Sequence, residues 1–264
     1  MLAFRPLRQL LRVAAVVLGL AGALVASPAS AAADLTDLWW NPSEPGWGIN
    51  FVQADSFIFA TFFVYGPDNK PVWYTAQMTR DNNGTWKGPM YLSSGSYYGA
   101  PYNGTLNNVD QTGNATFAPA SESSGLLTYN INNVNVTKLI QRQTLLSIDF
   151  SGTYMGALVT DVYNCTDGSP VRTQRRFIDV GATQVAGGSD RIDFSFSTGG
   201  ACSFSGVATQ SGRLFRMENA TYTCGTGPAT VYELKATSLG LEGRWTAPIA
   251  GGCTEYAVFS TVLK

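Results

Sequence analysis

Aromatic side chains around one carboxylate are the residues of this sequence that most favour ligand chemistry. Trp39, Trp40 and Trp47 lie close together among prolines and glycines, and Glu44 lies between the second and the third. Flat indole rings stack on the apolar faces of sugars and aromatic ligands, and neighbouring polar groups then fix the ligand's orientation. Alternatively, the indoles fill the end of a small barrel, because each buries a large apolar area.

Further aromatic residues extend this candidate surface. Trp73 and Tyr74 lie in a predicted strand, and three tyrosines lie in the Ser- and Gly-rich loop 93–103. Such a loop gives an adaptable contact surface at low entropic cost, and the alternative is an ordinary flexible loop. The ligand-binding candidates are Trp39, Trp40, Trp47, Trp73, Tyr74, Tyr97, Tyr98 and Tyr102.

The absence of histidine narrows the catalytic chemistry. It excludes serine triads, Cys–His dyads and His-ligated zinc. Glu44 is the one candidate catalytic residue, since burial beside the indoles would raise its pKa. Glycoside hydrolysis needs a second carboxylate at a defined separation, and the sequence places none. Because phosphate, dinucleotide and calcium motifs are also absent, we expect no cofactor and no metal.

The tryptophan segment also carries a resemblance. The sequence resembles a group of uncharacterised secreted proteins of proteobacteria with the pattern W-W-N-P-x-E-x-G-W-G, followed by an aromatic strand and P-x-W-Y. It departs from that pattern at Pro45, where a small residue is more usual. The matching stretches are 39–48, 62–65, 71–74 and, more loosely, 129–143 and 202–244. The resemblance implies export and no particular activity.

Residues 1–33 predict a secretory signal peptide. Three arginines form a basic start, 13–26 is an uninterrupted small and apolar run, and Ala-x-Ala cleavage sites follow. The run is shorter than the ~20 residues of a membrane span, so the mature chain should carry none. We expect an exported bacterial protein, located in the periplasm or outside the cell.

The charge balance excludes nucleic acid as a partner. Only 13% of residues are charged and the formal net charge is -1, without the basic patch that nucleic acid requires. A small cluster of Arg172, Arg175 and Arg176 is interpreted as solvated strand positions that pair with Asp179 or Asp193.

The cysteines predict two disulfides. Cys165, Cys202, Cys224 and Cys253 all lie in the second half of the chain, and an even number in an exported protein favours pairing. In an up-and-down sheet all four lie at the same end, so each of the three pairings is reachable. We favour Cys165–Cys202 with Cys224–Cys253, which would join neighbouring loops.

Short strands separated by Gly, Asn, Asp and Pro turns recur after residue 33, and no helical period appears. Both faces of strand 57–65 are apolar, so we expect it to be central and covered on both sides. The predicted strands are 47–53, 57–65, 72–79, 85–92, 105–110, 116–118, 126–131, 134–142, 154–163, 172–180, 191–196, 202–209, 214–224, 230–237, 241–246 and 254–263.

The predicted fold class is all-β, with two antiparallel up-and-down barrels or sandwiches. Tryptophans concentrate before residue 87 and cysteines follow residue 164. We therefore divide the chain into a Trp/Tyr-rich domain, 34–146, and a disulfide-stapled domain, 147–264, with one continuous domain as the alternative. Glycine–aromatic pairs at 46–47 and 152–154 are similar to the opening of lipocalin- and avidin-like barrels. An outer-membrane barrel is disfavoured by paired cysteines and the lack of two aromatic girdles.

The expected function is that of a secreted, non-catalytic binding protein that contacts a glycan or small-molecule ligand through its aromatic residues. Two alternatives remain. One is a structural or host-interaction factor whose aromatic residues are all core, and the other is a carboxylate-dependent hydrolase built on Glu44.

Overall fold

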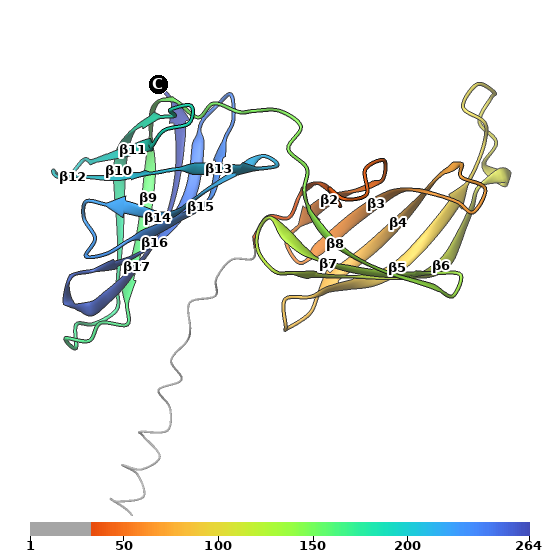
Figure 1. Cartoon of the computed structure of the whole chain (residues 1–264), viewed down its shortest axis with the longest axis horizontal. Helices are drawn as coiled ribbons and strands as arrows, with labels where there is room; N and C mark the ends of the chain where they lie inside the picture. The colour runs from red at the N-terminus through yellow and green to blue at the C-terminus, as the bar shows by residue number, and fades with distance from the viewer. Residues whose placement is uncertain (1–32) are drawn as a thin grey trace, which may run out of the picture. The chain divides into compact units, whose positions relative to one another are not determined.

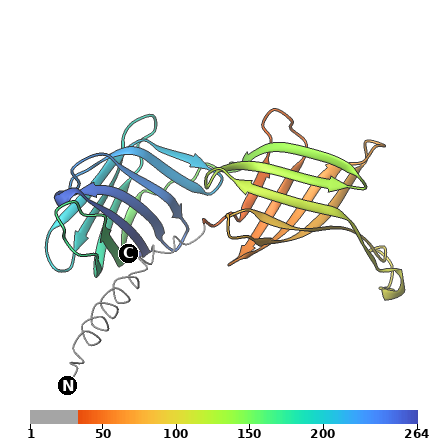
Figure 2. The same cartoon turned by 90° about the horizontal axis from the view of Figure 1, so that it is seen from below.

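The computed structural model describes residues 33–264, and the expected signal peptide lies outside them except for its last residue. The all-β class is confirmed: the described chain forms two closed, antiparallel, eight-stranded barrels (Figures 1 and 2). In each barrel, strands that follow one another in sequence pair with one another, with the exception of β12 (Ala201–Gly206) and β13 (Ala208–Ser211).

The first barrel contains β1 to β8, and β8 pairs with β1 to close it. The sequence pattern missed β1, because four residues are too few to show an alternation. The segments expected at 105–110 and 116–118 form one strand, β6. The bounds are β1 (Asp37–Trp40), β2 (Gly48–Ala54), β3 (Phe57–Tyr65), β4 (Pro71–Arg80), β5 (Trp86–Ser94), β6 (Asn108–Pro119), β7 (Ser124–Ile131) and β8 (Val134–Arg142), with a 3-10 turn η1 (Gly104–Leu106) before β6.

The second barrel contains β9 to β17, and it closes where β17 pairs with β9. Its eight predicted strands are confirmed, except that strand 202–209 is interrupted at Val207 into β12 and β13, which both pair with β14. The bounds are β9 (Gly152–Tyr163), β10 (Arg172–Thr183), β11 (Asp190–Phe196), β12 (Ala201–Gly206), β13 (Ala208–Ser211), β14 (Leu214–Tyr222), β15 (Ala229–Ala236), β16 (Leu241–Ile249), η2 (Ala250–Gly252) and β17 (Cys253–Leu263).

Strand β3 shows how closure divides the side chains between inside and outside. Its even positions Ile58, Ala60 and Phe62 are fully buried in the core of the first barrel. Its odd positions Phe57, Phe59, Phe63 and Tyr65 are exposed on the outer face. The prediction that both faces are covered was wrong, because a closed barrel uses only the inner face of each strand for its core.

The disulfides join Cys165 to Cys253 and Cys202 to Cys224, so the pairing favoured from the sequence was wrong. Each bond joins residues in, or two positions beyond, strands that already pair with each other. Tyr163 of β9 is opposite Thr254 of β17, immediately beside the first bond, and β12 pairs with β14 beside the second. Closure makes the first and last strands neighbours, a proximity that the order of loops along the chain does not reveal.

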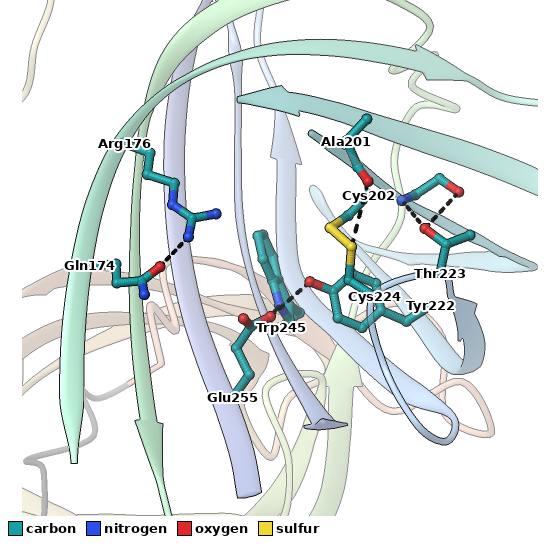
Figure 3. The surroundings of a disulfide bond; sticks show 10 residues. Gln174, Arg176, Ala201, Cys202, Tyr222, Thr223, Cys224, Trp245 and Glu255 are labelled. Carbon is teal, nitrogen blue, oxygen red and sulfur yellow. Dashed lines mark hydrogen bonds between the residues drawn. A yellow bond between two sulfur atoms is a disulfide. The ribbon is translucent and has the colours of Figure 1, made fainter. Parts of the chain in front are cut away.

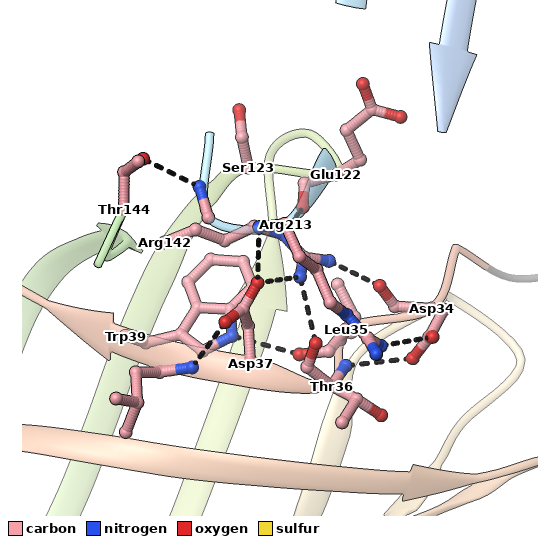
Figure 4. Close-up of polar contacts among 12 residues, drawn as sticks. Asp34, Leu35, Thr36, Asp37, Trp39, Glu122, Ser123, Arg142, Thr144 and Arg213 are labelled. Carbon is pink, nitrogen blue, oxygen red and sulfur yellow. Dashed lines mark hydrogen bonds and ion pairs between the residues drawn. The ribbon is translucent and has the colours of Figure 1, made fainter. Parts of the chain in front are cut away.

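Arg142 supports the closure of the first barrel, where β1 and β8 share only two residue pairs. Its fully buried guanidinium donates from Nε to the carbonyl oxygen of Glu122 at 2.6 Å, and from Nη1 to the carboxylate of Asp37 at 3.1 Å (Figure 4). The guanidinium also lies over the Trp39 ring, 5.0 Å from its centroid. A buried charge is tolerated only when it is paired and hydrogen-bonded, and these contacts satisfy that condition.

The carboxylate of Asp37 also accepts a hydrogen bond from the second barrel. The backbone N–H of Arg213, in the turn before β14, donates to Oδ2 of Asp37 at 3.1 Å. Beside it, the N–H of Gly212 donates to the Thr144 hydroxyl at 2.9 Å, and the Arg213 side chain pairs with Asp34 (Figure 4). Asp37 therefore links the closing seam of one barrel to a turn of the other.

We expect Arg142→Met to destabilise the protein by about 3–5 kcal/mol, since it leaves the Asp37 carboxylate partly buried without its strongest partner. The free energy of unfolding from urea titration measures this. The matched control is Arg80→Met at an exposed position of β4. Equal effects of the two substitutions would contradict the role given to Arg142.

We expect loss of the Cys165–Cys253 bond to destabilise the protein more than loss of the Cys202–Cys224 bond. The sequence separations are 88 and 22 residues, and chain entropy assigns such loops about 4–5 and about 3–4 kcal/mol. The paired Cys→Ser variants, compared by urea unfolding, test the order. Peptide mapping that linked Cys165 to Cys202 would refute the connectivity itself.

Candidate functional site

The aromatic candidates gather at one end of the first barrel. Alternate connections of an up-and-down barrel lie at the same end, and these are the connections 41–47, 66–70, 95–107 and 132–133. We call this the aromatic end. The connection 95–107 projects beyond the strands (Figure 1). The topology thus brings the tryptophan segment and the tyrosine loop to the same end, although about fifty residues separate them.

Three exposed rings lie on the outer face of β3 and β4, next to the connection 66–70 of the aromatic end. Phe63 on β3 is directly opposite Trp73 on β4, and Tyr65 follows on the same face. Together with Gly46 and Pro71 they line a surface cleft of about 280 Å³. Half of the Trp73 side chain is solvent-exposed (50%). Gly46 has a φ of 112°, a conformation that L side chains rarely adopt, so a larger residue would strain the wall beside Tyr65.

The tyrosine loop adds exposed phenol rings held by local contacts. The Tyr97 and Tyr98 rings lie 4.8 Å apart, and Tyr98 is 94% exposed. The Tyr102 hydroxyl accepts a hydrogen bond from Nδ2 of Asn107 at 2.6 Å. Ser96 ties the loop across its base, because its hydroxyl both donates to and accepts from the backbone of Asn103. The loop therefore presents polar and aromatic groups to solvent.

Glu44 fixes the tryptophan segment onto the barrel. Both of its carboxylate oxygens accept from Nζ of Lys138, at 2.7 and 2.8 Å, and Nε1 of Trp47 donates to Oε2 at 3.2 Å. Lys138 is two residues before buried Ile140 on β8, so both side chains lie on the inward face of the strand. The segment 41–47 is thus held by an ion pair with a lysine of the barrel lumen.

The chemistry of Glu44 differs from the sequence-based expectation. The hydrogen bond and positive charge of Lys138, together with the Trp47 hydrogen bond, lower the pKa of the carboxyl below its usual value. The expectation of a raised pKa was wrong, because the lysine outweighs the effect of the neighbouring indoles. Glu44 is therefore an ionised partner in an ion pair, which is not the state of a general acid at neutral pH.

The remaining candidates differ in exposure. Trp39 is fully buried, its Nε1 donates to the carbonyl oxygen of Leu35 at 2.9 Å, and its ring packs against Phe51 and Phe117. Trp39 is therefore a core residue that a ligand cannot contact, and the prediction that it binds a ligand was wrong. Trp40, Trp47 and Tyr74 are half-buried, and Trp40 lies opposite Gln141 at the seam between β1 and β8.

The structure shows a second cleft, of about 290 Å³, at the disulfide-bearing end of the second barrel. Its lining includes Arg176, Tyr222, Trp245 and Glu255 (Figure 3). The Tyr222 hydroxyl and Nε1 of Trp245 both donate to Oε1 of Glu255 at 2.8 Å. Burial, and then the charge of Glu255, raise the pKa of Tyr222, so its hydroxyl stays protonated at neutral pH.

The assignment of Arg176 to a solvated position paired with an aspartate was wrong. Its guanidinium lies 4.9 Å from the centre of the Phe196 ring, inside the cleft, while Asp179 pairs with Lys264 and Asp193 with Arg191. The alternation of β10 contained the signal, since Arg176 is two residues before buried Ile178 and so shares its inward face.

A wider, shallower hollow of about 640 Å³ lies on the outer face of the second barrel, over Met155, Phe177 and Val262. The carboxylate at its edge, Asp179, is paired with Lys264 at 2.6 Å. Ligand sites combine apolar walls with converging polar groups. The two clefts at the barrel ends meet that description better than this hollow.

Comparison with known proteins assigns no family. The sequence matches no protein-family model and no curated protein. Among residues 33–264, no helix is long and apolar enough to cross a membrane. The function is therefore argued from the two clefts themselves.

We expect Lys138→Met to raise the pKa of Glu44 toward its ordinary value of 4.5. In the native protein the pKa of Glu44 is lower than in the unfolded chain, so the ion pair contributes its full stabilisation at pH values above 4.5. This contribution is lost as the pH falls through the lowered pKa. Carboxyl ¹³C NMR titration measures the shift. Lys87→Met, which removes the partner of Asp81 instead, should leave Glu44 unchanged, and an unchanged Glu44 in Lys138→Met would contradict the assignment.

Proposed function

We propose that this protein is an exported, non-catalytic binding protein that holds a glycan at its aromatic end. The observation that carries the proposal is the group of three exposed rings, Phe63, Tyr65 and Trp73, beside one cleft. Exposed apolar clusters on soluble proteins mark interaction sites, since each ring costs free energy in water.

A glycan fits this surface for two reasons. The apolar faces of sugar rings stack on flat indole and phenol rings, which Trp73 and Tyr65 supply. The hydroxyls of Tyr97 and Tyr98, together with the polar side chains of segment 41–47, supply hydrogen bonds that orient a polyhydroxylated ligand.

Two further observations support the other parts of the proposal. The two disulfides favour an oxidising compartment such as the periplasm or the cell exterior. The ion pair of Glu44 argues against a hydrolase built on this carboxylate. The alternative in which all the aromatic residues are core describes Trp39, but it does not account for the exposure of Phe63 and Trp73.

Glycan-array screening followed by tryptophan-fluorescence titration tests the proposal. We expect Trp73→Ala and Tyr65→Ala each to weaken binding at least about tenfold, as central aromatic contacts do. The control is Phe177→Ala, an equally conspicuous ring that is 75% exposed on the outer face of the second barrel. The side chains of Trp73, Tyr65 and Phe177 are all at least half-exposed, so none of the three substitutions should change the midpoint of urea unfolding by much. Failure of every glycan to bind, or an equal loss in the control, would refute the proposal.

A further inference from the structure

The cleft in the second barrel is formed by inward-facing side chains of several strands. Leu158 from β9, Phe196 from β11, Tyr222 from β14 and Trp245 from β16 contribute its apolar walls. Tyr222 is held flat by a stacked contact with Phe204, at 4.3 Å between ring centroids and 2° between planes. The walls are therefore preorganised apolar surfaces.

The cleft has a fixed anionic side. Oε1 of Glu255 accepts two hydrogen bonds, one from Tyr222 and one from Trp245 (Figure 3). These donors orient the carboxylate, and Oε2 keeps its capacity to accept from a ligand. The raised pKa of Tyr222 keeps its hydroxyl a donor, and Glu255 is the acceptor of both hydrogen bonds.

The cleft also has a cationic side. In the described chain the guanidinium of Arg176 contacts neutral groups, namely Oε1 of Gln174 and the ring of Phe196 (Figure 3). The first barrel provides a contrast, because its inward Lys138 already has the carboxylate of Glu44 as a partner. In the second barrel, Arg176 and Glu255 both line the cleft, and each retains hydrogen-bonding capacity for a ligand.

The rim and size of the cleft limit what can enter. Gly199 and Gly200 form its edge with positive φ values of 89° and 90°, and no side chain projects from them. The volume of about 290 Å³ is at the lower limit for small-molecule sites. The cleft therefore accepts a compact molecule.

We propose that this cleft binds a free α-amino acid with an apolar or aromatic side chain. The ligand carboxylate pairs with Arg176, its ammonium donates to Oε2 of Glu255, and its side chain packs against Phe196 and Trp245. Both charges of the zwitterion are needed, because each meets a protein group of opposite charge in an apolar setting. This site uses none of the residues of the aromatic end.

The test is isothermal titration of the whole exported chain with L-phenylalanine, L-leucine, 3-phenylpropionate and 2-phenylethylamine. At least one of the two amino acids should bind, and for phenylalanine each single-charge analogue should bind at least about tenfold more weakly. The indole N–H resonance of Trp245, assigned with Trp245→Phe, should shift on binding.

Matched variants locate the site. Arg176→Gln and Glu255→Gln should each weaken amino-acid binding at least about tenfold. The amide oxygen introduced by Glu255→Gln can still accept from Tyr222 and Trp245, which preserves the local fold. The controls Arg175→Gln and Glu242→Gln change outward-facing residues of β10 and β16 that do not line the cleft, and they should have less than about a twofold effect.

Three outcomes would overturn the inference: neither amino acid binds the folded protein, 3-phenylpropionate or 2-phenylethylamine binds as tightly as phenylalanine, or the inward variants behave like their controls. Near-UV circular dichroism establishes that each variant is folded. Trp73→Ala should leave amino-acid binding unchanged, which separates this inference from the proposed glycan binding.

Discussion

At the seam where β8 returns to β1, two residue pairs and the buried guanidinium of Arg142 close the first barrel. Closure is the constraint on which the other features depend, because it decides which side chains face the lumen and which face solvent. Trp39 belongs to the core because it is on the inner face at this seam. Phe63 and Trp73 face outward for the same geometric reason.

The second barrel is closed by different interactions. A long ladder between β9 and β17 closes it, and a disulfide reinforces the end of that ladder. The two barrels also differ in the partners of their inward-facing charged side chains. In the first, a loop carboxylate neutralises Lys138, whereas in the second, Arg176 and Glu255 both line a cleft.

Local patterns in the sequence predicted most of the fold. Alternation and turn residues located the strands of the second barrel, apart from the break between β12 and β13, and most of the first, since period-two burial is a local property. The position of the cysteines at one end followed from the same up-and-down order. Their pairing did not, because closure brings Cys165 and Cys253 together from opposite ends of the barrel's sequence.

The candidate sites were only partly predictable. Exposed Trp73 and the tyrosine loop were identified from composition, but Phe63 and Tyr65 were assigned to a covered strand. The pairing of Glu44 with Lys138 joins residues 94 positions apart, so the direction of the Glu44 pKa shift required the fold. Arg176 could have been identified from its alternation with Ile178, whereas its proximity to Glu255 depends on closure.

The Cys165–Cys253 bond has a topological consequence. It joins the end of the first strand of the second barrel to the start of the last, so that the chain between them forms a covalent ring. A protease that cuts a single peptide bond within this ring opens it without releasing a fragment. Both new ends stay attached to the same molecule. Exposed turns such as the one at Gly199 and Gly200 can therefore be nicked while the barrel remains one covalent unit.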